Sequence, residues 1–128
     1  MSNNLFLRRI LALDSLSCLG MGLLMGLGAA ALAPIFGLPE SLVRGAGLAL
    51  LPLAAFIFWL ASRPNPPRAL VWAVILGNLA WTAESFVTLG SSEATALGTA
   101  FVTAQALAVL GLACLEYVGL RKAALVAA

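Results

Sequence analysis

Three carboxylates lie inside long apolar segments of this chain, and their chemistry needs explaining: Asp14, Glu84 and Glu116. Ionisable groups inside a membrane are costly and commonly mark proton or ion paths. Asp14 follows Arg9 by five residues and Glu116 precedes Arg121 by five, so each lies about one and a half helical turns from a basic boundary. If they face each other, they could share a proton. Alternatively, each could reach a basic side chain at the boundary, and we expect this local pairing, above all for Asp14.

Two amides, Asn78 and Gln105, lie near the middle of their apolar segments. Buried amides need partners, and a mutual hydrogen bond between neighbouring helices would contribute ~0.6 to 2 kcal/mol. Asn78 shares a helical face with Trp81 and Ser85, and Gln105 shares one with Glu116. These faces could line a polar cleft or clamp the register of the helices, and we expect the clamp. The candidate binding residues are Asp14, Asn78, Trp81, Gln105 and Glu116.

Catalytic chemistry has little support in the sequence. The chain contains no histidine, which removes the commonest metal ligand and the usual axial ligand of membrane haems. Cys18 and Cys114 have no metal-binding spacing and are interpreted as small apolar fillers. No phosphate loop, nucleophile with a base, or dense basic tract is recognisable. We therefore predict no enzyme, catalytic residue, metal site, cofactor or nucleic-acid partner.

The elements that position these residues follow from composition. The 128 residues are 62% hydrophobic and 9% charged, whereas soluble domains carry roughly 25% charged residues. Four apolar blocks each match the ~20 residues that cross a bilayer as a helix, and a membrane barrel would instead show short alternating segments. We predict an all-α polytopic membrane protein, a single-domain bundle of four transmembrane helices over residues 1–128. The predicted spans are about 10–33, 42–61, 69–89 and 94–120.

Breakers and caps set the predicted limits of the spans. Pro34 is expected to close the first span, and Pro52 to kink the second. The polar stretch 62–68 separates spans two and three, and Ser92 is expected to cap the fourth helix. The first apolar run is too long for the core of a secretory signal, so we expect it to stay as a permanent helix.

The basic residues predict the orientation. In a four-span topology, six of the seven Lys and Arg residues lie on one side, namely Arg8, Arg9, Arg63, Arg68, Arg121 and Lys122. Only Arg44 lies on the other side, where we expect it to pair with Glu84. The positive-inside rule then places both termini in the cytoplasm.

Small residues at a spacing of four indicate close helix packing, within the bundle or in a dimer. The stripes are Cys18, Gly22 and Gly26 in span one, and Ala100, Ala104 and Ala108 in span four, with Gly45, Gly47 and Ala49 in span two. We expect membrane lipids, other membrane-protein subunits or further copies of the chain as partners.

Several stretches resemble a family of small four-span bacterial integral membrane proteins of no known activity: residues 37–40, 45–52, 67–72 and 78–81. The resemblance implies a location in the bacterial inner membrane. With it, we predict an accessory or scaffold subunit that packs on a larger membrane complex or on itself, with lipid or another lipophile in its grooves.

Asp14 is also placed like the acidic residue of the small multidrug resistance exporters, which the chain resembles in length and helix number. That resemblance implies exchange of protons for lipophilic cations, and Trp72, Trp81 and Tyr117 could stack on a cation. The chain departs from these exporters in having Asp instead of Glu, a second carboxylate at Glu116, and proline-rich connections. A proton-coupled exporter is therefore the alternative function.

Overall fold

The chain folds into four helices, as predicted. The computed structural model describes residues 2–127, and side chains from residue 4 to residue 123. The helices are α1 (Ser2–Phe36), α2 (Glu40–Ala61), α3 (Arg68–Ser91) and α4 (Ala96–Ala127). Each contains a stretch that is long and apolar enough to cross a membrane. The all-α class and the four candidate spans are thus confirmed.

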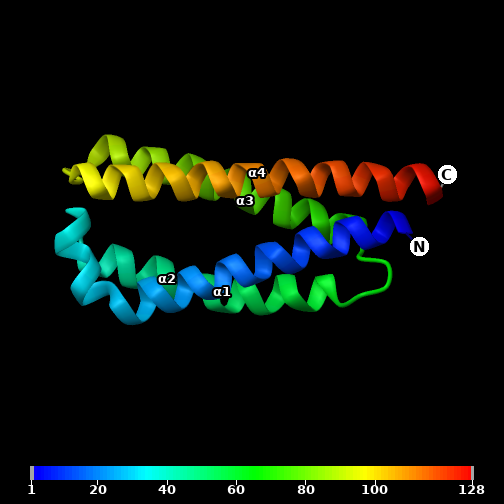
Figure 1. Ribbon diagram of the computed structural model, residues 1–128, viewed down its shortest axis with the longest axis horizontal. Helices are drawn as coiled ribbons and strands as arrows, with labels where there is room; N and C mark the ends of the chain where they lie inside the picture. The colour runs from blue at the N-terminus through cyan, green and yellow to red at the C-terminus, as the bar shows by residue number, and fades with distance from the viewer. Residues whose placement is uncertain (1, 128) are drawn as a thin grey trace.

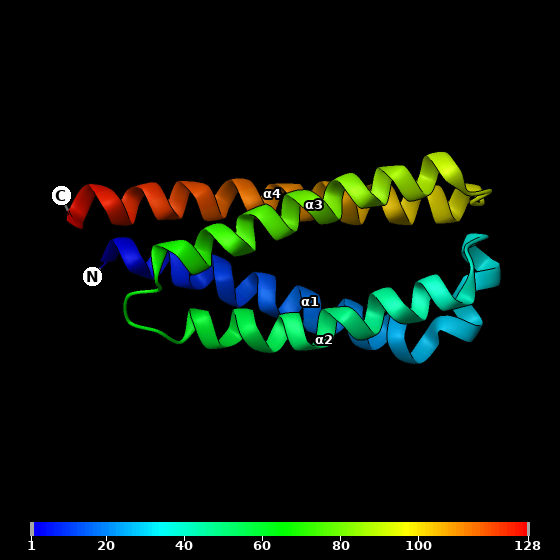
Figure 2. The ribbon, with the colours of Figure 1, turned by 180° about the vertical axis from the view of Figure 1, so that it is seen from behind.

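The helices form two hairpins, α1 with α2 and α3 with α4 (Figure 1). Helix α1 also packs along α4, whereas α2 and α3 barely touch. Both ends of the chain lie at one end of the bundle, together with the connection between α2 and α3, and the two shorter connections lie at the other (Figure 2). The arrangement therefore gathers the six basic residues of the predicted cytoplasmic side at one end.

Glycines let α1 and α2 approach closely. A Cβ on Gly47 would collide with the backbone nitrogen of Gly26, and a Cβ on Gly22 would lie 2.9 Å from the carbonyl oxygen of Gly47. Cys18, the first member of the predicted stripe, is buried as well. Gly22 and Gly26, the other two members of this stripe, thus lie where α1 meets α2.

The alanine stripe of α4 is not buried within the single chain, and its predicted contact in a dimer stays a prediction. Ala100, Ala104 and Ala108 are exposed in the single chain. Helix α4 instead buries Val102 and Ala106 on the face that it shares with Gln105 and Glu116. Ala104 and Ala108 lie beside this face and line the space between the two hairpins.

The end of α1 also differs from the prediction. Pro34 lies inside the helix, which continues to Phe36, because a proline in the last turn removes only one backbone hydrogen bond. The helix ends at Gly37, whose φ of 69° is left-handed. The Leu38 amide then donates to the Ala33 carbonyl at 3.1 Å, as in a Schellman ending.

The start of α4 lies later than predicted. Thr95, and not Ser92, caps the helix, since its hydroxyl accepts a 3.0 Å hydrogen bond from the Gly98 amide. The Ser92 hydroxyl donates backward to the Thr88 carbonyl. Ser92 therefore serves the end of α3, and the predicted cap at Ser92 is wrong.

The two hairpins are fastened together at the end that carries the short connections. The Thr95 amide donates to the Phe36 carbonyl at 3.0 Å, and the Thr95 hydroxyl donates to the Ile35 carbonyl at 2.8 Å. The Phe36 and Phe101 rings stack with centroids 4.5 Å apart. These contacts close the bundle at this end.

At the end that carries the termini, α1 meets α4 directly. A Cβ on Gly119 would lie 3.0 Å from the Cα of Leu7, and Lys122 lies over the Phe6 ring at 4.4 Å. The main hydrophobic core fills this half of the molecule, and its fully buried members include Leu11, Ile57, Leu60 and Val71. The hairpins are thus joined at both ends, and the space between them lies in the middle.

Candidate functional site

Asp14 of α1 and Glu116 of α4 meet inside the bundle. They are 2% and 0% exposed. The Asn78 side-chain nitrogen, from α3, donates to the Asp14 Oδ2 at 2.8 Å and to the Glu116 Oε1 at 2.9 Å. Because one nitrogen contacts both groups, these carboxyl oxygens cannot be farther apart than the sum of the two distances. The Cys18 thiol donates to the other Asp14 oxygen at 3.6 Å.

Neither carboxylate forms an ion pair with any basic side chain that the structure describes, so the expected local pairing of Asp14 is wrong. Arg8 instead donates to the Ala61 carbonyl at 3.0 Å, and Arg121 lies over the Tyr117 ring. Residues five apart on a helix point about 140° apart. The basic residues are therefore at the right depth for the carboxylates but on the wrong side of the helices.

The second amide, Gln105, belongs to a separate polar group on α3 and α4. Its Oε1 accepts from the Trp81 indole at 2.9 Å, and its Nε2 donates to the Ser85 hydroxyl at 2.9 Å and the Val102 carbonyl at 3.0 Å. The expected bond between Asn78 and Gln105 is therefore wrong, because each amide finds a partner at its own level. The prediction that both amides are satisfied inside the bundle is confirmed.

Four of the five candidate binding residues line one cavity of about 430 Å³ between the hairpins. This volume lies within the ~300 to 1,000 Å³ of small-molecule sites. The polar members are Asp14, Ser17, Asn78 and Gln105, and Trp81 presents its ring. Every helix contributes to the apolar wall, including Met21, Leu50, Leu53, Phe101 and Leu112. Glu116 stays outside this wall, behind Asn78.

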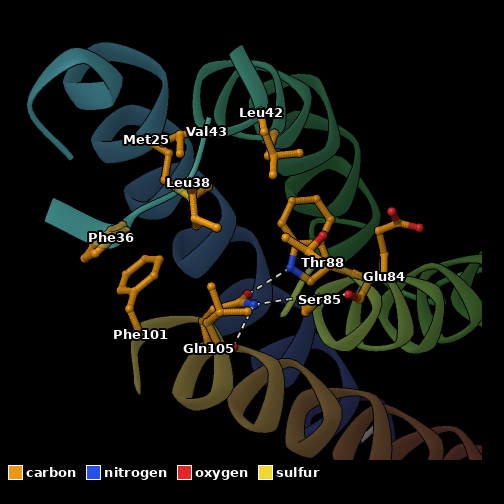
Figure 3. Close-up of a pocket in the computed structure, with 13 residues that line it drawn as sticks. Met25, Phe36, Leu38, Leu42, Val43, Glu84, Ser85, Thr88, Phe101 and Gln105 are labelled. Atoms are coloured by element: carbon orange, nitrogen blue, oxygen red, sulfur yellow. Dashed lines mark hydrogen bonds between the residues drawn. The ribbon is translucent and has the colours of Figure 1, made fainter. Parts of the chain in front are cut away.

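A smaller cavity of about 110 Å³ lies beside the first, towards the short connections, and shares Trp81, Phe101 and Gln105 with it. Figure 3 shows Gln105 in its wall with its hydrogen bonds, while the exposed Glu84 carboxylate lies at the edge and points away from Gln105. The expected pairing of Glu84 with Arg44 is wrong. Arg44 pairs with Glu40, one turn away, at 2.7 Å.

The cation-stacking residues suggested by the sequence are separated in the structure. Trp81 lines both cavities. Trp72 and Tyr117 instead pack edge to face against each other, with centroids 5.7 Å apart, outside the cavity wall. Sequence reasoning missed Phe101 as an aromatic wall and the bond from Cys18 to Asp14, although the i, i+4 spacing of the latter two was visible.

The cavity combines an apolar wall with one carboxylate. In the described part of the chain, no group of three or more metal-ligating side chains occurs. A large apolar wall favours a lipophilic molecule, and the carboxylate on that wall favours a cationic or hydrogen-donating group. The site therefore suits an amphiphile that carries one polar group.

Comparisons with protein-family models, curated proteins and solved structures found no match. The two family resemblances thus stay predictions, and any function must be argued from the site itself.

Proposed function

We propose that this chain is a non-enzymatic protein of the bacterial inner membrane that exchanges protons for lipophilic cations at Asp14. It crosses the membrane four times, with both termini in the cytoplasm. Support for this topology comes from the four apolar helices and from the six basic residues at one end of the bundle. The cavity between the hairpins favours a proton-coupled exporter over an accessory subunit.

The observation that carries the proposal is a buried carboxylate on an apolar cavity wall without a basic partner. Asp14 lines the cavity and receives hydrogen bonds only from Asn78 and Cys18 in the described structure. An isolated carboxylate in a low-dielectric site either takes up a proton or attracts a cation. A structural ion pair would have neutralised this charge, and Arg8, Arg121 and Lys122 at the boundary contact other groups.

The aromatic wall supports the choice of a lipophilic cation. Trp81 and Phe101 are on the same cavity as Asp14, and an aromatic ring attracts a cation through its π-face. Helices α2 and α3 barely touch, so separating them to admit a lipophilic ligand from the bilayer would break few contacts. Polar solutes would need a route through water instead.

Binding of tetraphenylphosphonium to the purified protein in lipid nanodiscs tests this function. We expect saturable binding that weakens as the pH falls, because protons compete for Asp14. Asp14→Asn should lower the affinity at least tenfold, which is about 1.4 kcal/mol. Glu93→Gln is the matched control, because it removes an exposed carboxylate outside the helices. Equal binding by wild type and Asp14→Asn would refute the proposal.

A second candidate is the accessory or scaffold role. The exposed stripe of Ala100, Ala104 and Ala108 could receive a helix of another subunit or of a second copy. Purification in mild detergent separates the candidates. A stable set of larger co-purifying subunits, with no cation binding after reconstitution, would favour the accessory role.

A further inference from the structure

We propose that Glu116 is a carboxylic acid that keeps its proton, while Asp14 exchanges its own, so that the site releases one proton for each monovalent cation bound. This inference deepens the proposed function by assigning different roles to its two carboxyl groups and by setting the exchange ratio.

The two groups differ in access. Asp14 borders the cavity that a ligand would occupy. Glu116 is fully buried outside the cavity wall and reaches the cluster through Asn78. Exchange with a ligand therefore belongs to Asp14.

The hydrogen bonds of Glu116 explain why it would hold a proton. One oxygen accepts from Asn78, and the other, Oε2, is buried without a hydrogen-bond partner in the described structure. An unpartnered carboxylate oxygen is costly in an apolar interior. A proton removes the charge and turns the carboxyl into a donor, and the Asp14 carboxyl, which shares the Asn78 nitrogen with Glu116, is the neighbouring acceptor.

The remaining neighbours neither neutralise the pair nor compete with it. From α1, the titratable group that faces the pair is the Cys18 thiol, which donates to Asp14. From α3 comes Asn78, which is neutral, and the residues that α2 contributes to this cavity are Leu50 and Leu53. The described basic side chains form no ion pair with either carboxyl.

The charge balance of the site then determines how many protons are released for each cation that binds. Without ligand, the neutral site holds both protons. When a monovalent cation binds, the O–H bond of Asp14 breaks and its proton leaves to water. The Asp14 carboxylate pairs with the cation, accepting hydrogen bonds from Asn78, Cys18 and the Glu116 carboxyl. The site is neutral in both states, which a low-dielectric interior favours.

Infrared spectroscopy of the ligand-free protein tests the role of Glu116 without any cation. We expect a protonated-carboxyl C=O band at neutral pH that persists on mild alkalinisation. The Glu116 component of this band should disappear in Glu116→Gln, whereas the component from protonated Asp14 should remain, and the whole band should stay unchanged in Glu84→Gln, whose carboxyl is exposed. If wild type and Glu116→Gln show the same protonated-carboxyl bands, Glu116 is ionised and the proposal is wrong.

Calorimetry with tetraphenylphosphonium in buffers of different ionisation enthalpy counts the protons released. Wild type and Glu116→Gln should both release about one proton per cation and differ in affinity by less than about tenfold. Loss of proton release in Glu116→Gln would make Glu116 the exchanging group and overturn the assignment. If no cation binds to the wild type, the proposed function fails, while the infrared band still decides the state of Glu116.

Discussion

At the scale of single residues, Asn78 joins the polar centre of the molecule. Its one nitrogen donates to carboxyl groups from α1 and α4, so three helices meet at one side chain. Burial of two carboxyl groups at such a junction is costly, and Asn78 supplies a hydrogen bond to each of them. Asn78 is therefore as important for folding as for the site.

Asn78→Leu tests this role. The substitution keeps the approximate volume but removes the donor to Asp14 and Glu116, and each lost partner of a buried group costs about 1 to 3 kcal/mol. We expect a lower unfolding midpoint in detergent, measured by circular dichroism. Asn65→Leu, in an exposed loop, is the control. A midpoint equal to that of wild type would mean that the junction contributes little to stability.

At the scale of helices, glycine decides how closely α1 and α2 pack. Gly45 and Gly47 lie two residues apart on α2, but only Gly47 meets the backbone of α1. A comparison of substitutions at these two glycines therefore distinguishes the packing role of Gly47 from the general effect of glycine on helix stability.

Gly47→Ala should destabilise the protein by about 1 to 3 kcal/mol, because its Cβ forces the two backbones apart. Gly45→Ala should be neutral or stabilising by up to ~1 kcal/mol, since nothing lies near its added Cβ and Ala favours helix. Reversible unfolding in mixed micelles measures both free energies. Equal effects of the two substitutions would show that the close approach at Gly47 does not matter.

The cap of α4 offers a second comparison between neighbours. Thr95→Ala removes both the cap of α4 and the bond to Ile35, so we expect a loss of about 0.5 to 2 kcal/mol. Ser92→Ala removes only a bond back to Thr88 and should cost less. Thermal unfolding of the two variants gives the order, and the reverse order would restore Ser92 as the more important cap.

Sequence patterns predicted the helices well because length and hydropathy alone determine which segments can cross a bilayer. Helix ends were harder, since Pro34 is tolerated in a last turn and Thr95 competes with Ser92 as a cap. The matching depth of Asp14 and Glu116 allowed their approach, but pairing with basic residues at the boundary was expected instead. Their shared partner Asn78 was not, because hydropathy gives the depth of a residue but not the rotation of its helix about its own axis.

At the scale of the whole molecule, the two ends of the bundle differ in charge. The end with the termini carries six of the seven basic residues, and the end with the short connections carries Arg44, which is paired with Glu40. Such an asymmetry orients short-looped membrane proteins during insertion.

A fluorescent reporter that matures only in the cytoplasm should be active when fused to the C-terminus. The same reporter inserted in the connection at residues 92–95 should be inactive, and a phosphatase that needs the periplasm should show the opposite pattern. Activity of the phosphatase at the C-terminus would reverse the proposed orientation, although the arrangement of the four helices would stand.

The fastening of the hairpins at both ends has a mechanical consequence. Two beams that are clamped at their ends cannot rock apart as rigid bodies, and they separate only by bowing at mid-span. Helix α2 has its proline, Pro52, at this level, between the cavity residues Leu50 and Leu53, and a missing backbone hydrogen bond makes a helix easier to bend there. We therefore expect a bulky lipophilic cation to enter the cavity when the middle of α2 bends, while the contacts between the hairpins at both ends of the bundle remain in place.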